Sequence, residues 1–209
     1  MRLYLVRHGQ SDGNVGSDGG PDPALTELGH KQAALASDRL AAEGIEAVHC
    51  SPLRRALETA TIIGERLGLT PSVWVELCEK WGGEPTPRRR WPGRREIQAA
   101  FPNSLFPDDM PEQEWWRATG ETELDAFMRA GVVEARVRRL YESTDKRVLM
   151  ITHGTFGAIL ISQILGAPPC GYTRFSQNNC CISTIEVEPG RAKLSRLNAT
   201  DHLPPDALT

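Results

Sequence analysis

Two histidines, each directly after a short apolar run, are the residues of this sequence best suited to chemistry. Arg7 and His8 follow the apolar run of residues 3–6, and His153 and Gly154 follow a second run near the other end of the chain. An open parallel sheet presents side chains to ligands where its strands end. One neutral imidazole can accept a phosphoryl group covalently, while another donates hydrogen bonds to its oxygens. The pattern therefore predicts a phosphate pocket.

Arginines and a carboxyl group would complete such a pocket. Arg7 and one of Arg54 and Arg55 offer planar, bidentate contacts to phosphate oxygens. Their charge disfavours imidazolium and so keeps the nucleophile unprotonated. A carboxyl group must protonate the leaving oxygen and then activate water. We expect Glu79 in this role, with Glu76 as the alternative.

Strand and helix patterns alternate along the chain, which is typical of a parallel sheet covered by helices. We predict strands over residues 2–6, 45–49, 71–77 and 147–152, helices over residues 27–43, 52–67, 121–141 and 155–165, and a hairpin of residues 181–187 and 192–197. Parallel strands ending at His8, Ser51 and His153 would bring these residues to one edge of the sheet.

The helix boundaries and faces also follow from residue types. Thr26 is the expected N-cap of the first helix, and Ser51 with Pro52 would begin the second. The helix N-termini after Pro52 and Gly154 would direct unpaired N–H groups at the phosphate. In the helix of residues 121–141, the inward candidates are Leu124, Phe127, Met128, Val133, Val137 and Leu140. Residues from Pro204 onward are expected to be loose.

Composition indicates the class of protein. The 209 residues fit one domain with a substantial core, and the net charge of -3 disfavours nucleic acid and anionic lipid as partners. The apolar run at residues 3–6 is too short for a signal peptide or a membrane span. An odd number of cysteines without a C-x-x-C pair argues against a disulfide framework and a zinc site: Cys50, Cys78, Cys170, Cys180 and Cys181. We expect a cytoplasmic protein with a small-molecule partner, no cofactor and no metal; a homo-oligomer stays open.

Residues 79–120 break the regular pattern, because proline, tryptophan and arginine are frequent and no apolar period persists. We interpret them as an insertion, or lid, within a single domain of residues 1–209. The tryptophans would cover a small secondary core or a lid: Trp81, Trp91, Trp115 and Trp116. The arginines would form a solvated face balanced by nearby acidic residues: residues 88–90, Arg94 and Arg95.

Five short motifs, in one order along both halves of the chain, resemble the histidine phosphatase superfamily, also called the phosphoglycerate mutase-like family. They are residues 7–11 with Asn14, residues 25–29 with Gln32 and Ala33, residues 51–56 with Thr59 and Ala60, Leu77 and Glu79 with Gly83, and residues 152–154. The resemblance implies a three-layer α/β/α fold with a mostly parallel central sheet.

The resemblance also implies roles for individual residues. His8 would be phosphorylated, Glu79 would be the proton donor, and the phosphate would be held by Arg7, Arg55, His153 and Asn14. We further expect Gln10, Ser11 and Gly154, which lie within the same motifs, to contact the substrate. Arg54 would be an outward neighbour. Where many members carry a second glycine or another small residue after His153-Gly154, this chain has Thr155 and Phe156, which would narrow the pocket.

Three functions fit these residues. The first is a metal-independent phosphomonoesterase that passes the phosphoryl group of a small metabolite to His8 and then to water. The second is a phosphoglycerate mutase; members of that branch resemble one another in a longer chain and insertion, so this shorter chain favours the phosphatase. The third is a non-catalytic phosphate-binding or interaction module, against which the full set of His8, Arg55 and His153 speaks.

Overall fold

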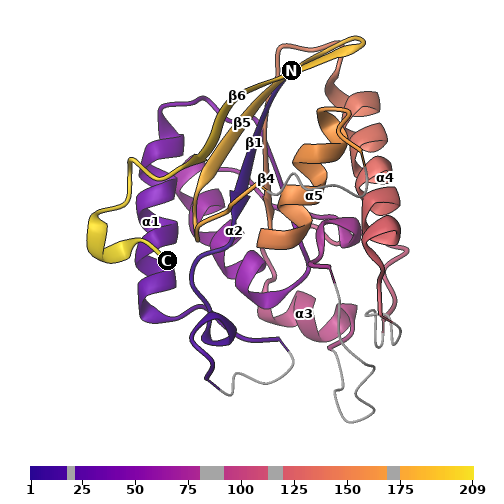
Figure 1. The fold of residues 1–209 in the computed structure, drawn as a ribbon. Coiled ribbons are helices and arrows are strands. Elements are labelled where there is room, and N and C mark those ends of the chain that lie inside the picture. Colours follow the sequence, from indigo (N-terminus) through magenta and orange to yellow (C-terminus); the bar gives the residue numbers. More distant parts are fainter. Residues whose placement is uncertain (18–21, 81–91, 113–119, 169–174) are drawn as a thin grey trace.

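The computed structural model describes residues 1–17, 22–80, 92–112, 120–168 and 175–209, and it centres on one six-stranded sheet (Figure 1). The strand order is β3-β2-β4-β1-β5-β6. The strands are β1 Arg2–Arg7, β2 Ala47–Cys50, β3 Ser72–Val73, β4 Arg147–Thr152, β5 Ile182–Glu188 and β6 Arg191–Ala199. The first four are parallel to one another, and the β5–β6 hairpin is antiparallel to β1. The predicted mostly parallel sheet and hairpin are confirmed.

Helices cover both faces of this sheet. They are α1 Glu27–Ala41, α2 Arg54–Leu67, α3 Arg94–Ala100, α4 Glu123–Tyr141 and α5 Gly154–Ile164. The pair α1 and α2 packs on one face, and the pair α4 and α5 packs on the other (Figure 1). This is the predicted three-layer α/β/α arrangement. None of the helices in the described ranges combines the length and the apolar character needed to cross a bilayer.

The central strands are buried on both faces, which explains their continuous apolar sequences. In β1, Leu3 and Leu5 face the layer of α4 and α5, whereas Tyr4 and Val6 face the layer of α1 and α2. Successive side chains of a strand point to opposite faces, so one run of four apolar residues supplies both cores.

The strand ladder brings the predicted strand ends together. Arg7 pairs with Thr152 in the parallel register of β1 and β4. One residue further on, His8 N donates to Thr152 O at 3.0 Å, and Ser51 N donates to Ile151 O at 3.0 Å. The ladder therefore extends just beyond β1 and β2, and it sets His8 and Ser51 on either side of the end of β4, which leads directly into His153.

Two predicted boundaries shift. Helix α2 begins at Arg54 with Leu53 as its N-cap residue, so the prediction of Ser51 as N-cap and Pro52 as first helical residue is wrong. Ser51 is instead drawn to the end of β4, where its hydroxyl bonds another side chain. The third strand is only Ser72–Val73, because the chain then turns into the 3-10 helix Val75–Leu77.

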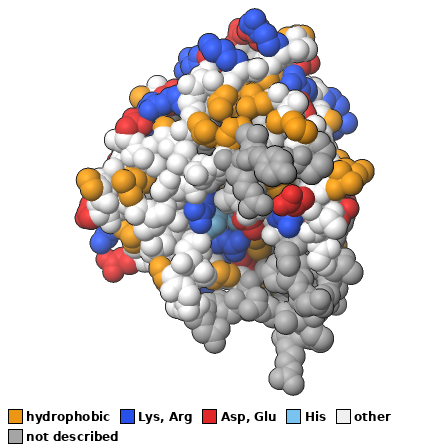
Figure 2. All heavy atoms as spheres, viewed as in Figure 1, with side chains coloured by type: hydrophobic (Ala, Val, Ile, Leu, Met, Phe, Trp, Pro, Cys, Tyr) orange, Lys and Arg blue, Asp and Glu red, His pale blue; other side chains and the backbone are white. Residues whose placement is uncertain are grey.

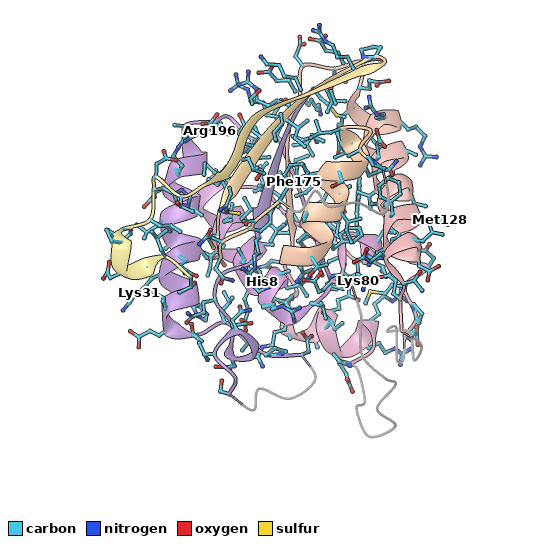
Figure 3. The ribbon with its side chains drawn as sticks, in the orientation of Figure 1. His8, Lys31, Lys80, Met128, Phe175 and Arg196 are labelled. Atoms are coloured by element: carbon cyan, nitrogen blue, oxygen red, sulfur yellow. The ribbon has the colours of Figure 1, made fainter. Side chains whose placement is uncertain are left out.

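The inward face of α4 differs from the prediction. Leu124, Met128 and Leu140 are 56%, 65% and 47% exposed, so their assignment to the core is wrong, and Figure 3 shows Met128 on the outer side of α4. Val133 and Val137 are buried as predicted, together with Ala126 and Ala130. Two small residues in the stripe let α4 lie close to α5, and they turn the larger apolar side chains outward.

The described stretch of residues 92–112, within the predicted insertion, is more regular than its sequence pattern suggested. It contains α3, and its Ile97 and Met110 are buried in the core beneath α1 and α2. Arg94 and Arg95 both form ion pairs with Glu112, at 3.5 and 3.0 Å, as expected for a face of balanced charges. Predictions for other residues lie outside the described ranges: Trp81, Gly83, residues 88–90, Trp91, Trp115, Trp116 and Cys170.

The segment from Pro204 onward is docked, so the prediction of a loose tail is wrong. Residues 205–207 form a 3-10 helix, and Ala207 is buried. Gln32 of α1 fixes this segment by donating its amide group to Ala207 O at 2.8 Å and to Thr209 Oγ1 at 2.9 Å. Specific polar contacts with α1 thus hold a segment whose composition resembles a loop.

Candidate active site

His8 lies at the carboxyl end of β1 and is only 3% exposed (Figure 3). Its Nδ1 lies 2.6 Å from Gly9 O. A carbonyl oxygen only accepts hydrogen bonds, so we assign the ring proton to Nδ1, and Nε2 keeps its lone pair. Burial lowers the pKa of His8 well below its usual value, and the charges of Arg55 and Arg7 lower it further. His8 is therefore a neutral imidazole with a nucleophilic Nε2.

Arg55 contacts that nucleophilic atom directly. Its Nε–H donates to His8 Nε2 at 3.0 Å, and its side chain is 13% exposed. Burial lowers the pKa of Arg55, an effect that the carboxylates of Asp22 and Glu79 oppose. Arg54, in contrast, turns outward and bonds Glu58 at 2.8 Å, as predicted for the neighbour without a role in the site.

The second histidine lies beside the first. The ring centroids of His8 and His153 are 5.1 Å apart, and His153 is fully buried. His153 Nε2 is 2.7 Å from Ser51 Oγ, which also accepts a bond from Leu53 N. We assign the Ser51 hydroxyl proton to His153 Nε2, which leaves the ring N–H on Nδ1. That atom is buried and has no hydrogen-bond partner among the described residues, so it is a donor available to a ligand.

Arg7 supplies a second such donor. Its Nη1 donates to Gln177 O at 2.6 Å, while its buried Nε has no partner in the described part of the chain. The guanidinium packs against Gly154, where an added Cβ would lie 3.4 Å from Arg7 Nε. An alanine there would make only an ordinary van der Waals contact, so the guanidinium lies directly beside the first residue of α5.

Two glycines explain how the loop after His8 keeps its path. A Cβ on Gly9 would overlap Gly29 O, and a Cβ on Gly29 would overlap Gln10 O. The loop and the first turn of α1 are therefore in backbone contact, which only residues without a side chain permit. Thr59 of α2 anchors the same loop by accepting from Gly9 N at 3.1 Å.

Three other residues of this loop, Gln10, Ser11 and Asn14, are predicted to contact the substrate. Asn14 Oδ1 accepts from Ser11 N at 3.0 Å and from Ser11 Oγ at 3.1 Å, which leaves the amide group of Asn14 for a ligand. The side chain of Gln10 instead bonds the Thr26 hydroxyl at 2.8 Å. Ser11 and Gln10 therefore shape the loop, and direct contact of either with substrate stays a prediction.

Glu79 is placed at the N-terminus of α5. Its Oε1 accepts from Phe156 N at 2.8 Å and from Lys80 N at 2.7 Å, and its Oε2 accepts from Thr155 N at 3.2 Å. The carboxylate also acts electrostatically on Arg7 and Arg55, so it lies beside the side chains that we expect to hold the phosphate. Glu76, the alternative acid, is instead paired with Arg136 at 3.4 Å.

Some of the first amides of α2 and α5 are bound by protein carboxylates. The first amide of α2, Arg54 N, is bound by both carboxylate oxygens of Asp22 at 2.9 and 3.0 Å. At α5 the second and third amides bind Glu79. Protein carboxylates thus bind three of the amides that we expected the phosphate to use, Arg54 N, Thr155 N and Phe156 N. That Arg7, Arg55 and His153 hold the phosphate stays a prediction.

Three contributors were missed from the sequence: Ser51 as the partner of His153, Asp22 and Asn179. Asp22 lies 3.9 Å from Arg55, and burial raises its pKa to about 6. Asn179 is buried and donates to His8 O at 2.9 Å and to Asn14 Oδ1 at 3.3 Å. Asp22 and Asn179 stand in loops without periodicity, so no local signal indicated where they would fold.

The pocket is cationic in a chain of net charge -3. Figure 2 shows a hollow in which a histidine side chain is flanked by basic side chains, with acidic groups to one side. This local charge favours an anion such as a phosphate ester.

Comparison with known proteins agrees with this geometry. Residues 3–200 match the model of the histidine phosphatase superfamily, branch 1. The chain belongs to this superfamily. Among curated relatives of this histidine phosphatase, a glucosyl-3-phosphoglycerate phosphatase of Mycolicibacterium vanbaalenii is 33% identical over 178 residues, covering 80% of this chain and 75% of the relative. A probable phosphoglycerate mutase of Yersinia pestis is 28% identical over 201 residues, covering 90% and 86%.

The solved structures include a similar histidine phosphatase. The native structure of a mycobacterial glucosyl-3-phosphoglycerate phosphatase superposes with a TM-score of 0.65 at 25% identity, covering 95% of this chain and 99% of that one. The agreement extends over nearly the whole chain, so the family resemblance stated from five short motifs is confirmed.

Proposed function

We propose that this histidine phosphatase is a phosphomonoesterase that works without a metal ion, through a phosphohistidine at His8, on a small phosphorylated metabolite. The observation that carries the proposal is the state of His8. Its Nδ1 is bonded to Gly9 O, its Nε2 faces Arg55, and its pKa is lowered by burial and by two arginines.

In the first step, His8 Nε2 attacks phosphorus and the bond from phosphorus to the ester oxygen breaks. Arg7, Arg55 and His153 Nδ1–H hold the three other oxygens as charge develops on them. Glu79 must carry a proton for this step, and the leaving oxygen takes that proton, so that the alcohol departs neutral. Glu79 Oε2 is suited to this transfer, because it accepts one long bond whereas Oε1 accepts two short ones.

In the second step, water attacks the phosphohistidine. Glu79, now a carboxylate, takes a proton from that water, and the electron pair of the P–N bond returns to His8 Nε2. Inorganic phosphate leaves, and both residues regain their starting states. The same two residues thus serve both halves of the reaction, as expected when one pocket forms and hydrolyses a covalent intermediate.

A phosphoglycerate mutase is the second candidate, favoured by the match to the probable mutase of Yersinia pestis. A mutase returns the phosphoryl group to a second hydroxyl of a bound phosphoglycerate and excludes water. The phosphatase is favoured by the match to the glucosyl-3-phosphoglycerate phosphatase, which is the more similar of the two relatives.

One experiment separates these functions. The purified protein is incubated with 4-nitrophenyl phosphate and, separately, with 3-phosphoglycerate, both with a chelator present, beside a His8→Ala variant. We expect free phosphate from the wild type alone. When the substrate carries labelled phosphorus, rapid quenching of the wild type should trap that label on His8. Formation of 2-phosphoglycerate without free phosphate would establish the mutase instead. Phosphate binding without turnover would establish a non-catalytic module.

A cytoplasmic location and a single domain over residues 1–209 with an insertion at residues 79–120 belong to the same proposal. The location is supported by four free, buried cysteines in the described ranges: Cys50, Cys78, Cys180 and Cys181. The single domain is supported by the pairing of β1 with β4, which come from opposite halves of the sequence, at the centre of one sheet.

A further inference from the structure

Arg129 of α4 binds the backbone of the segment that carries Glu79. Its Nη1 donates to Glu76 O at 2.6 Å and to Cys78 O at 2.8 Å, and its Nη2 donates to Glu79 O at 3.4 Å. Three carbonyl groups within four residues thus share one guanidinium. A carbonyl left without a donor in such a buried place is costly, so this arginine strongly favours one path of the segment.

Arg129 is itself held from two sides. Glu121 accepts bidentately from Nε at 2.8 Å and from Nη2 at 2.6 Å. The ring of Phe156 lies under the guanidinium, 3.9 Å from its central carbon. The side chains of Arg129 and Glu121 are 14% and 17% exposed, so solvent screens the pair little. A planar, bidentate pair stacked on a ring fixes the orientation of the guanidinium.

Phe156 joins this group to the acid itself. Its ring supports Arg129, and its backbone N–H donates to Glu79 Oε1 at 2.8 Å. Glu79 is therefore held at its carboxyl group by α5 and at its backbone by α4. Proton transfer needs the acid within hydrogen-bond distance of the leaving oxygen, and an error of about 1 Å in placement can cost about a hundredfold in rate.

We propose that Arg129 is the positioning residue for Glu79: the Arg129–Glu121 pair holds the segment of residues 76–79 so that the carboxyl group meets the leaving oxygen. This inference rests on the proposed function, in which Glu79 protonates that oxygen. Arg129 acts through Glu79 and has no part in holding the phosphate.

A cavity of about 980 Å³ beside Glu79 gives this role its context. Glu79, Arg129 and Glu121 are among the residues that line it, whereas His8 and His153 are not. Glu79 thus stands between the phosphate pocket and a space large enough for the rest of a substrate. Because Arg129 borders this space, the test must separate positioning of the acid from direct contact with substrate.

The test compares two esters in Arg129→Met. An alkyl ester such as glycerol 2-phosphate needs a proton on its leaving oxygen. The ester 4-nitrophenyl phosphate depends far less on this proton, because 4-nitrophenolate is a good leaving group. We expect kcat for the alkyl ester to fall about tenfold or more, kcat for the aryl ester to fall less than about threefold, and KM for both to stay within about twofold. In a Glu79→Gln background, Arg129→Met should cause no further loss.

Arg138→Met is the matched control, because Arg138 lies on the same helix, bridges Glu134 and Glu142, and donates to a backbone carbonyl, Glu188 O, away from the acid. This control should leave the ratio of kcat for the alkyl ester to kcat for the aryl ester unchanged. If Arg129→Met fails to fold, Glu121→Gln serves instead, because it weakens the same pair. It should lower kcat for the alkyl ester more than kcat for the aryl ester, by a smaller factor than Arg129→Met.

A readout without turnover completes the test. Thr155 N and Phe156 N are bonded to Glu79, so their hydrogen exchange should be faster in Arg129→Met and unchanged in Arg138→Met. An equal loss for both esters, a loss that adds to Glu79→Gln, or a change confined to KM would overturn the positioning role. A wild type that hydrolyses neither ester would contradict the proposed function alone, and the amide exchange would still decide whether Arg129 holds Glu79.

Discussion

Arg55 donates its Nε–H to Nε2 of His8 across 3.0 Å, and so the arginine that we expect to hold the phosphate covers the lone pair of the proposed nucleophile. Attack on phosphorus requires that this bond be given up. The oxygens of a bound phosphate offer the guanidinium stronger, charge-assisted bonds, so substrate binding and exposure of the nucleophile become one event. The same charge keeps His8 unprotonated until then.

Arg55→Gln is expected to change both the rate and its pH dependence. Loss of a cation from the developing charge should lower kcat/KM about a hundredfold to a thousandfold. Neutral His8 is the active form, and its pKa is depressed by burial first and by Arg55 second. Removing Arg55 raises that pKa, so the acidic limb of the profile should move to higher pH. A pH profile of kcat/KM measures this, and an unmoved limb would exclude Arg55 as a cause of the depressed pKa.

Ser51→Ala is expected to lower kcat about tenfold with little change in global fold, because it removes the hydroxyl that fixes the tautomer of His153. Both ring nitrogens of His153 would then be free to carry the proton, and only one of the two forms donates from Nδ1. Ser162→Ala is the control, since Ser162 also has a buried hydroxyl bonded inside the core, to Ala158 O at 3.0 Å. Steady-state assays measure kcat of both variants. An equal loss of kcat in Ser51→Ala and Ser162→Ala would contradict the assigned role of Ser51.

Gly29→Ala is expected to destabilise the fold by about 1–3 kcal/mol and to lower activity, because its Cβ would overlap Gln10 O and displace the loop after His8. Gly131→Ala on α4 is the matched control. There the nearest atom to a new Cβ is Gln163 Nε2 at 3.5 Å, so alanine fits. Its higher helix propensity should raise stability by up to about 1 kcal/mol. Urea denaturation compares the two, and a tolerated Gly29→Ala would show that the loop does not depend on this backbone contact.

The sequence predicted those parts of the fold and site that depend on strands. The runs at residues 3–6 and 148–151 are apolar on both faces, so they indicate central parallel strands, and each run leads directly to a histidine. A strand end has a fixed direction and a fixed neighbour once the sheet is formed. The meeting of His8 and His153 therefore followed from local pattern and sheet geometry alone.

What could not be predicted depends on contacts between distant loops and helices. Helix α4 shows two apolar stripes, and only the position of α5 decides that the stripe with Ala126 and Ala130 turns inward while Met128 turns outward. Asp22 reaches the N-terminus of α2, and Arg129 reaches the segment of Glu79, across 32 and 50 residues of chain. Nothing local in the sequence encodes such pairs.

His49 provides a test of stability against pH that is independent of the reaction. Its ring stacks on Trp74 with centroids 4.1 Å apart, and its Nε2 lies 2.9 Å from the Tyr141 hydroxyl. Burial, aided by the charge of Arg136, lowers the pKa of His49 to about 4. Unfolded histidine titrates near 6.5, so between these two values the unfolded chain binds the proton and the native fold does not.

The stabilising effect of a neutral His49 is therefore complete above pH 6.5 and is lost progressively as the pH falls toward 4. Between pH 7 and pH 5 this one residue should lower the free energy of unfolding by about 2 kcal/mol. Glutamine does not titrate. The free energy of unfolding of His49→Gln should therefore fall less than that of the wild type between pH 7 and pH 5, by about 2 kcal/mol, whatever the stability of the variant at pH 7. Urea denaturation of both proteins at the two pH values measures the difference. The buried residues His8 and His153 titrate alike in both proteins and cancel, so equal losses would mean that folding does not lower the pKa of His49.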